Sequence, residues 1–332
     1  MMNVSRLSSV VIVTYNHGKY IEGCLQSVPD NEPKEVVVVD NGSTDGTVEL
    51  IRNNFPEVKL IQSPSNLGYG GGNNLGVRHA KGEYVVILNP DTRVDENWLE
   101  ELVRPLTKRT RLITTPKILL YDGSAINTIG NIVHFTGLTF TKGYLEPPNR
   151  YERAMYLTGI SGACFAMRKR EYLELGGFDE NFFMYNEDGE LSWRAHANGF
   201  KILYVPTAVV YHDYTLKVPA NKIYHLERGR YMILRKYLTV RERMSILPSL
   251  IISEILTLGY AILLGPSGVK FKIKGLLDGV RARVEKVSPA NGLINELEVT
   301  IPEDQLSYTM LDKVIKRLAN RIYRWNHKVV GE

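Results

Sequence analysis

A single acidic side chain, Asp91, follows a short and wholly apolar run of the chain. Residues 85–88 read Val-Val-Ile-Leu and lead into Asn89-Pro90-Asp91. A run of this length that stops at a turn signal is typical of a strand buried on both faces, and Pro90 cannot donate a ladder hydrogen bond. Asp91 would then lie at the carboxyl end of a strand, where open α/β sheets bind ligands and a carboxylate suits a divalent cation that holds a phosphate. The alternative is that Asp91-Thr92 only opens a turn.

Two adjacent acids, Glu187 and Asp188, follow an aromatic run at residues 182–185 and begin a helical pattern that continues through residues 191–197. Acids at a helix N-terminus are stabilised by the helix dipole, which explains them without any function. The functional interpretation is a carboxylate at the floor of an aromatic-lined pocket that acts as a general base. Trp193, inside this pattern, fits either a buried core or a platform for a sugar ring.

A histidine, His212, ends the apolar stretch at residues 208–211. A lone histidine is usually structural, but one that ends a strand in an acid-rich site could complete a metal shell. His212 is therefore a second candidate metal ligand beside Asp91.

Polar clusters also follow three earlier apolar runs. The pairs of run and cluster are residues 9–13 with 14–18, 36–39 with 40–46, and 58–61 with 66–74. The carboxyl ends of parallel strands meet at one edge of a sheet, so these clusters are expected beside Asp91. Asn, Asp and Gly make ordinary turns, but three such loops on one edge, with a triple glycine in the third, favour a nucleotide site.

The triple glycine, Gly70-Gly71-Gly72, matches neither common phosphate-binding motif. No Gly-Lys-Ser/Thr follows it, and no Gly-x-Gly-x-x-Gly follows the first strand, so neither a P-loop nor a dinucleotide fold is expected. Glycines here would let the backbone approach a ligand closely, and a flexible turn is the alternative.

Helical apolar spacing separates the predicted strands, at residues 21–28, 48–55, 75–80 and 98–106. Strands that alternate with such helices predict an α/β fold whose sheet is mostly parallel and covered on both faces. Further along, residues 113–120 form a predicted strand and residues 131–143 a hairpin or a loop over the site. Residues 202–205 and 208–211 are predicted as two short strands.

Length and composition are those of a globular chain of about two domains. The chain has 332 residues, of which 44% are hydrophobic and 23% charged. Cys24 and Cys164 lie far apart in apolar surroundings, which predicts neither a metal site nor a disulfide framework and favours a reducing compartment. No charged segment followed by an apolar one precedes the first strand, so no secretory signal is expected.

In order and spacing, these segments together resemble the family 2 glycosyltransferases, which have the GT-A fold. The segments that carry the resemblance are residues 11–16, 37–46, 66–74, 89–91, 186–188 with Trp193-Arg194, and His212. It covers residues 8–215 closely and continues more loosely to about residue 285. The resemblance implies a GT-A catalytic domain at 1–215, with helices on both sides of the sheet, and a helical C-terminal region at 216–332.

The resemblance also implies roles for the matched residues. Asp188 would be the general base, with Glu187 near enough to compete, and Asp91 would hold Mg²⁺ or Mn²⁺ with His212 as a possible second ligand. The acceptor or sugar would meet Trp193, Arg194 and Gly162. The nucleotide would be bound by Thr14, Tyr15, Asn16, Asp40, Asn41, Asn66, Gly70, Gly71 and Asn73. The usual metal motif is Asp-x-Asp, and the neutral Asn89 in its first position predicts a modest cation affinity.

The C-terminal region is basic and apolar. Residues 216–286 hold 14 Lys/Arg and 5 Asp/Glu, within a chain of net charge +5. Residues 246–264 approach the length of a membrane span, but Glu254 at their middle and Pro248 argue against one. We expect helices that lie in the plane of an anionic membrane surface; a soluble helical core or an oligomer contact is the alternative. Nucleic acid is not expected, because the basic residues alternate with aliphatic rather than aromatic ones.

The resemblance, taken with the basic and apolar C-terminal region, implies an inverting glycosyltransferase at the cytoplasmic face of the cell membrane. It would move a sugar, with rhamnose as the narrower candidate, from a nucleotide-diphosphate sugar to a saccharide or lipid-linked saccharide in envelope polysaccharide or glycolipid synthesis. One alternative, a sugar-nucleotide nucleotidyltransferase, needs a basic Gly-rich loop that residues 14–18 do not provide. The other is a non-catalytic nucleotide-sugar-binding or scaffold protein. The donor base, the linkage and the oligomeric state are not predicted.

Overall fold

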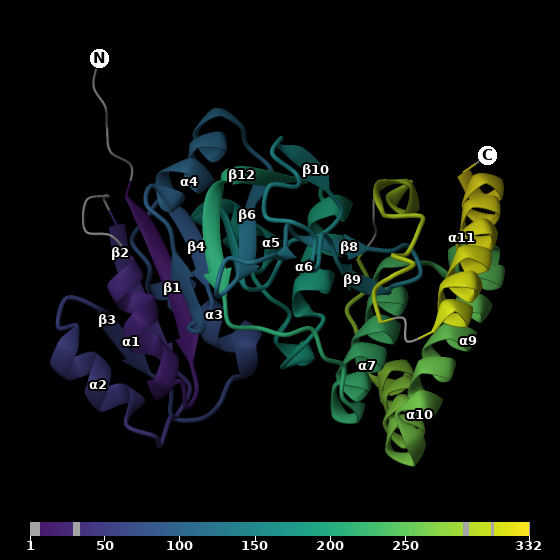
Figure 1. Cartoon of the computed structure of the whole chain (residues 1–332), viewed down its shortest axis with the longest axis horizontal. Coiled ribbons are helices and arrows are strands. Elements are labelled where there is room, and N and C mark those ends of the chain that lie inside the picture. Colours follow the sequence, from purple (N-terminus) through teal and green to yellow (C-terminus); the bar gives the residue numbers. More distant parts are fainter. Residues whose placement is uncertain (1–6, 29–33, 288–291, 307–308, 332) are drawn as a thin grey trace.

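A mixed β-sheet forms the centre of the computed structural model, which describes residues 7–28, 34–287, 292–306 and 309–331 (Figure 1). Its strand order is β10-β12-β6-β11-β4-β1-β2-β3, with β5 paired to β12 and β7 to β6. β1 pairs in parallel with β2 and β4, and β12 with β6, whereas β11 runs antiparallel between β4 and β6. These strands are β1 (Ser8–Thr14), β2 (Lys34–Asp40), β3 (Lys59–Gln62), β4 (Tyr84–Leu88), β5 (Thr92–Val94), β6 (Leu112–Leu120), β7 (Ile126–Thr128), β10 (Met155–Leu157), β11 (Cys164–Arg168) and β12 (Lys201–His212). The predicted α/β class with a mostly parallel sheet is confirmed.

Six helices cover the two faces of this sheet. They are α1 (Gly18–Ser27), α2 (Thr47–Asn54), α3 (Gly68–His79), α4 (Trp98–Lys108), α5 (Lys169–Leu175) and α6 (Glu187–Ala197). Successive strand residues point to opposite faces, so Val10 packs in one core with α1, α2 and α4, and Val11 in a second core with α3, α5 and α6. Trp98 is fully buried in the first core, and the parallel strands β1, β2 and β4 end at the same edge of the sheet.

The triple glycine lies inside α3, whose helix starts earlier than predicted. A Cβ at Gly72 would lie 2.7 Å from Val13 Cγ1, and one at Gly76 would lie 2.4 Å from Val11 Cγ1. Glycine is therefore required where α3 packs closely on β1. The missing Cβ atoms of Gly70 and Gly71 make room for Phe178 and Leu67, and the approach of their backbone to a ligand stays a prediction.

Two further predictions concern the later strands. Residues 202–205 and 208–211 belong to one strand, β12, whose pairing with β6 shifts register between Val205 and Val209. The predicted hairpin within residues 131–143 is present as β8 (Asn131–Val133) and β9 (Thr139–Thr141).

The C-terminal region packs beside this hairpin as a group of helices (Figure 1). They are α7 (Ala220–Tyr237), α8 (Val240–Ser245), α9 (Leu247–Leu263), α10 (Gly265–Arg281) and α11 (Met310–Gly331). A third core joins Phe135 and Trp193 of the sheet-bearing part to Met232 of α7 and Tyr323 of α11. The expected boundary at residue 215 falls between β12 and α7, and the division into two domains stays a prediction.

Helix α9 buries its polar side and exposes its apolar side. Ser249 and Ser253 are fully buried, and both bond to side chains of α11, Ser249 to Asn326 and Ser253 to Tyr323. Ile251 and Ile255, by contrast, are 53% and 55% exposed. In the described part of the chain, no helix combines the length and the apolar character that crossing a membrane requires.

Glu254, the lone charge of α9, belongs to a buried cluster of ions. Its carboxylate lies 2.7 Å from Arg230 Nη1 of α7 and 3.0 Å from Lys272 Nζ of α10. Glu227 completes the cluster at 2.8 Å from Lys272 Nζ. Burial alone would raise the pKa of Glu254, but Arg230 and Lys272 outweigh it and hold that pKa below its ordinary value. The cluster explains why an acid interrupts this apolar stretch: it fixes α9 to α7 and α10.

We expect Lys272→Met to lower the free energy of unfolding by about 3 kcal/mol, because it leaves buried carboxylates short of a counter-ion. Lys270, two residues away on α10, is exposed. Lys270→Met should therefore change stability by no more than about 0.5 kcal/mol. Urea unfolding followed by circular dichroism compares the two variants, and equal stabilities would remove the cluster from this role.

Candidate active site

A cavity of about 960 Å³ lies where the sheet meets the C-terminal helices. Asp91, Glu187, Asp188 and His212 all line it, although they come from the ends of β4 and β12 and from the start of α6. Its volume is at the upper end of the range for small-molecule sites. The predicted metal ligand Asp91 and the predicted base Asp188 therefore face one space that is large enough for a donor and an acceptor.

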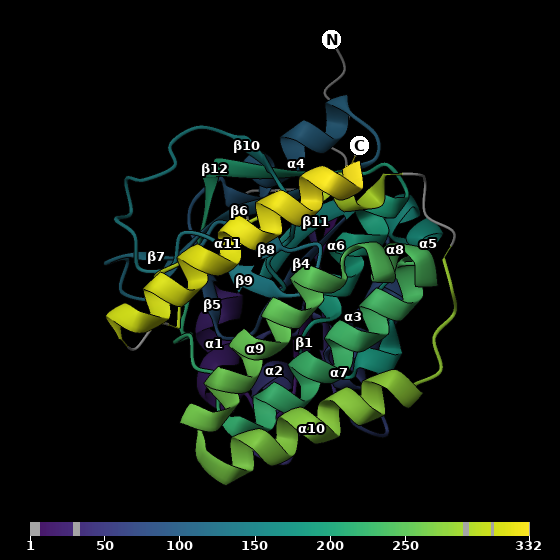
Figure 2. The same ribbon diagram turned by 90° about the vertical axis from the view of Figure 1, so that its right-hand side faces the viewer.

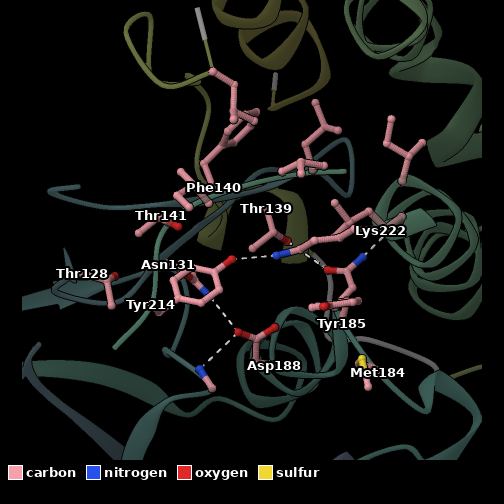
Figure 3. A pocket seen from close by; sticks show the side chains of 18 of the residues that line it. Thr128, Asn131, Thr139, Phe140, Thr141, Met184, Tyr185, Asp188, Tyr214 and Lys222 are labelled. Atoms are coloured by element: carbon pink, nitrogen blue, oxygen red, sulfur yellow. Dashed lines mark hydrogen bonds between the residues drawn. The ribbon is translucent and has the colours of Figure 1, made fainter. Parts of the chain in front are cut away.

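Asp188 is held in a fixed orientation at the start of α6 (Figure 3). Its Oδ2 accepts hydrogen bonds from Asn131 Nδ2 at 2.8 Å and from Gly162 N at 3.2 Å, and its Oδ1 accepts from Gly189 N at 2.8 Å. The preceding Asn186 adopts a left-handed conformation with φ of +69°, which turns the chain into the helix. Three donors from three segments make Asp188 a preorganised acceptor of a proton.

The two adjacent acids differ in their environments. Burial, and then the charge of Asp188, raise the pKa of Glu187 to about 8, and Glu187 Oε2 has no hydrogen-bond partner among the described residues. Burial also raises the pKa of Asp188, but the Gly189 and Gly162 N–H groups oppose this. The hydrogen bonds thus favour the charge on Asp188 and the proton on Glu187, which makes Asp188 the better candidate base.

Asp91 and His212 lie side by side, with Nε2 of the histidine 3.2 Å from Oδ1 of the acid. Asn127 Nδ2 donates to Tyr214 O at 3.0 Å, so the Asn127 oxygen faces His212 Nδ1 at 3.3 Å and this nitrogen carries the ring proton. Nε2 then presents a lone pair, as in metal-binding histidines that are oriented by a second residue.

The residues at this point fit a divalent cation. Within the described residues, Asn89 Oδ1, Asp91 Oδ1 and His212 Nε2 are all buried without a hydrogen-bond partner. No three His, Cys, Asp or Glu side chains of the described ranges are grouped to hold a metal. Mg²⁺ and similar ions are commonly held by one or two protein ligands together with phosphates and water, so such a sparse set suits an ion that arrives with a diphosphate.

The predicted nucleotide-binding residues divide into two groups. Tyr15, Asn41 and Asn66 line the cavity. The remaining six do not line it, namely Thr14, Asn16, Asp40, Gly70, Gly71 and Asn73. Two of these six shape the loops at its edge: Asp40 Oδ2 accepts from Ser43 N at 3.0 Å, and Asn16 Oδ1 accepts from Thr44 N at 2.8 Å. Asp40 and Asn16 thus support the loop backbone beside the cavity, and direct contact of these six residues with a nucleotide stays a prediction.

Of the three residues that were predicted to contact the acceptor or the sugar, two lie away from the cavity. Gly162 lines the cavity, but Trp193 is fully buried in the third core and Arg194 pairs with Glu190 at 2.7 Å. Five residues separate Trp193 from Asp188, which turns its side chain about 140° around the helix, away from the cavity. The prediction of a sugar platform at Trp193 and Arg194 is therefore wrong.

Three cavity residues were not anticipated. Asn131 comes from the hairpin, whose predicted position over the site was the available signal. Lys222 of α7 donates to Tyr214 OH at 2.8 Å (Figure 3). Tyr214 stacks on His212 with ring centroids 5.4 Å apart. No sequence motif marks Lys222 or Tyr214, because the fold alone brings them beside the acids.

Asn131 offers a direct test of the base. Asn131→Ala removes a donor that stabilises the charged form of Asp188, so the pKa of Asp188, already raised by burial, rises further. Activity is lost as the pH falls through that pKa, and we expect the acidic limb of the kcat/KM profile to move up by about one pH unit. The exposed Asn53→Ala serves as control. An unmoved acidic limb in Asn131→Ala would contradict the assignment.

Together, a mostly parallel sheet, a carboxylate after β4 and a second acid at the start of α6 on one cavity define the class of GT-A glycosyltransferases. The model of the family described as "Glycosyl transferase family 2" matches residues 9–176, and the chain belongs to this family. The chain is therefore a glycosyltransferase, as the resemblance implied.

Known proteins similar to the chain agree with this class. The chain is 30% identical over 254 residues to the N-acetylglucosaminyl-diphospho-decaprenol L-rhamnosyltransferase of Mycobacterium tuberculosis, a match that covers 68% of this chain and 83% of the relative. Among solved structures, GalNAc-T7 with UDP, GalNAc and Mn²⁺ matches with a TM-score of 0.60 and 20% identity over 82% of this chain and 55% of that one. S. aureus TarS 1–349 in complex with UDP-GlcNAc matches with a TM-score of 0.56 and 20% identity over 97% and 90% of the two chains. The two structures support the fold.

Proposed function

We propose that the enzyme transfers a sugar, with inversion, from a nucleoside-diphosphate sugar to a lipid-linked saccharide in envelope polysaccharide or glycolipid synthesis. The observation that carries this proposal is the shared cavity of Asp91 and Asp188. A sugar hydroxyl is far too weak an acid to lose its proton unaided near neutral pH, so a base must accept the proton as the hydroxyl attacks. Asp188, oriented by Asn131 and Gly162, is suited to that task.

The proposed reaction is a single displacement. The acceptor oxygen forms a bond to the anomeric carbon, the bond from that carbon to the diphosphate oxygen breaks, and the acceptor proton passes to Asp188. The diphosphate leaves with the electron pair, and its developing charge is what a bound divalent cation stabilises. Asp91, with His212 and Asn89, would hold Mg²⁺ or Mn²⁺. Glu187, protonated beside the base, would take no part as a nucleophile, which leaves inversion as the outcome.

The mycobacterial relative suggests the finer assignments. Its name specifies rhamnosyl transfer to a sugar-diphospho-lipid, which supports nucleotide-linked rhamnose as donor and a lipid-diphosphate saccharide as acceptor. An assay with a panel of nucleotide sugars, with the product anomer determined by NMR, tests both. Release of pyrophosphate would instead indicate a nucleotidyltransferase, and binding without any turnover would indicate a scaffold protein.

A peripheral attachment to the cytoplasmic face of the cell membrane is part of this proposal. The helices α9 and α11 lie on the same side of the molecule (Figure 2). Both expose apolar side chains, and on α11 these alternate with the exposed Arg317, Arg321 and Arg324. On α11, Leu318 and Trp325 are 51% and 59% exposed, as Ile251 and Ile255 are on α9. Apolar patches of this kind on a basic region favour contact with an anionic membrane.

We expect the double variant Ile251→Glu with Leu318→Glu to lose most binding to vesicles that contain anionic lipid, because both charges would enter the membrane interface. A control with the same charge, Leu145→Glu with Leu173→Glu, changes exposed leucines that lie outside the C-terminal helices. Sedimentation with vesicles compares the two double variants. Equal binding would show that the faces of α9 and α11 do not contact lipid.

A further inference from the structure

The cavity extends well beyond the catalytic acids. Past Asp188, apolar residues of the hairpin, α7, α9 and the segment before α11 line it. Those used in the argument below are Val218 just before α7, Leu226 of α7, and Ile255 and Leu263 of α9. We call this part the apolar limb.

The apolar limb opens on the proposed membrane-facing side. Ile255 and Leu263 line the cavity, and yet they are 55% and 62% exposed, so they belong both to the cavity and to the outer surface of α9. An apolar chain could therefore pass from a membrane into the cavity without crossing water. Nothing in the transfer of a polar sugar requires such a lining, so the limb needs an occupant of its own.

A cation lies where the apolar limb meets the catalytic acids. Lys222 Nζ is 2.8 Å from Tyr214 OH and 4.5 Å from the centre of the Tyr185 ring (Figure 3). In the described part of the chain, no carboxylate lies within ion-pair distance of Lys222, unlike Arg230 and Lys272 nearby. Asp188 and Glu187 act on this ammonium only from beyond ion-pair distance. A largely buried ammonium without a direct ion pair is costly, and an anionic group of a ligand would compensate it.

We infer that the apolar limb binds the chain of a lipid-linked acceptor and that Lys222 binds the phosphate that joins this chain to the sugar. This inference rests on the proposed function and adds to it the position of the acceptor. The order of parts along the cavity matches the order of parts in such a molecule: the sugar at Asp188, the phosphate at Lys222 and the chain toward Ile255 and Leu263. The membrane-facing side of α9 would then be the entrance for the acceptor as well as an anchor.

Farnesyl diphosphate is a suitable probe, since it joins a short apolar chain to a diphosphate. Its equilibrium binding is measured in EDTA, so that cation-dependent binding at Asp91 does not contribute, with pyrophosphate and farnesol as the head-only and chain-only ligands. We expect farnesyl diphosphate to bind at least about tenfold more tightly than either, and Lys222→Gln to weaken it by about tenfold, the usual size of one charge-assisted hydrogen bond. Binding as weak as that of farnesol would overturn the inference.

Two variants of the apolar limb test its occupant. Leu226→Trp and Val218→Trp each fill the limb from a different segment, so one failure to fold leaves the other, and each should weaken farnesyl diphosphate by about tenfold. Ile251→Glu, on the outer side of α9 and outside the cavity lining, is the control for adsorption to the surface. Weakening by Ile251→Glu but by neither tryptophan would show binding at the surface only.

The role of Lys222 is separated from donor binding in the same preparations. If Lys222→Gln weakens the binding of UDP with Mg²⁺ as much as that of farnesyl diphosphate, Lys222 serves the donor and the inference fails. If instead the proposed function is wrong, the unaltered enzyme will show no Asp188-dependent hydrolysis of any nucleotide sugar.

Discussion

Asp188→Asn is expected to keep donor binding and to lose at least about a hundredfold in turnover, the low end for a missing general base. The amide has nearly the shape of the carboxylate, and its oxygen can still accept from Gly162 N or Gly189 N, so the site should remain folded. What it loses is the ability to take a proton from the attacking hydroxyl. Initial rates at saturating donor and acceptor, together with a donor dissociation constant, measure the two expectations separately.

The adjacent acid provides the matched control. Burial and the neighbouring Asp188 raise the pKa of Glu187, so Glu187 is protonated near neutral pH and Glu187→Gln replaces one neutral group by another. We expect Glu187→Gln to stay within about tenfold of the unaltered enzyme, well above the hundredfold loss of Asp188→Asn. Near-normal transfer by Asp188→Asn with a severe loss in Glu187→Gln would exchange the roles of the two acids.

The sequence indicated the positions of the main acids because strand ends are local signals. The apolar run before Asp91 and the stop at Pro90 predicted the strand end, and parallel pairing then placed the polar loops on one edge. The same reasoning predicted the α/β class and the helix faces that cover the sheet. These inferences need only the periodicity of apolar residues and the direction of the strands.

The predictions that failed depended on contacts between distant segments. The triple glycine seemed suited to a ligand, but Gly72 in it allows α3 to pack on β1, and a sequence pattern alone does not distinguish close packing from close binding. The resemblance assigned Trp193 to the sugar site, but the helical rotation between Asp188 and Trp193 turns its side chain into the core. Lys222 and Tyr214 carried no signal, because only the folded chain brings them to the acids.

The apolar stretch at residues 246–264 shows that the number of apolar residues in a helix does not tell which side of that helix is buried. Residues 246–264 read as nearly uniform, but α9 turns Ser249 and Ser253 inward and Ile251 and Ile255 outward. A hydropathy sum does not reveal which side of a helix is covered. The partners of Glu254 on α7 and α10 explain its position, and neither of them is near it in the chain.

The second large effect is expected for Asp91→Asn, which should lower kcat/KM for transfer by about a hundredfold or more. The change removes the only formal negative charge among Asn89, Asp91 and His212, while it conserves the size of the side chain. Stabilisation of the leaving diphosphate by a cation amounts to several kcal/mol, and each 1.4 kcal/mol corresponds to about tenfold in rate. Titration of the activity with Mn²⁺ should show that a much higher cation concentration is needed.

Asn89→Asp supplies the opposite change at the same place. It restores the Asp-x-Asp pattern and replaces the Asn89 amide by a carboxylate. The Oδ1 of that amide is buried without a partner among the described residues. Carboxylates bind Mg²⁺ and Mn²⁺ more strongly than amides do, so half-maximal activity should require less cation than in the unaltered enzyme. Opposite shifts in the two variants would locate the cation between residues 89 and 91, since a purely structural Asp91 would not make the Asn89 variant sensitive to cation concentration. Full activity of the unaltered enzyme in EDTA would exclude this role for Asp91.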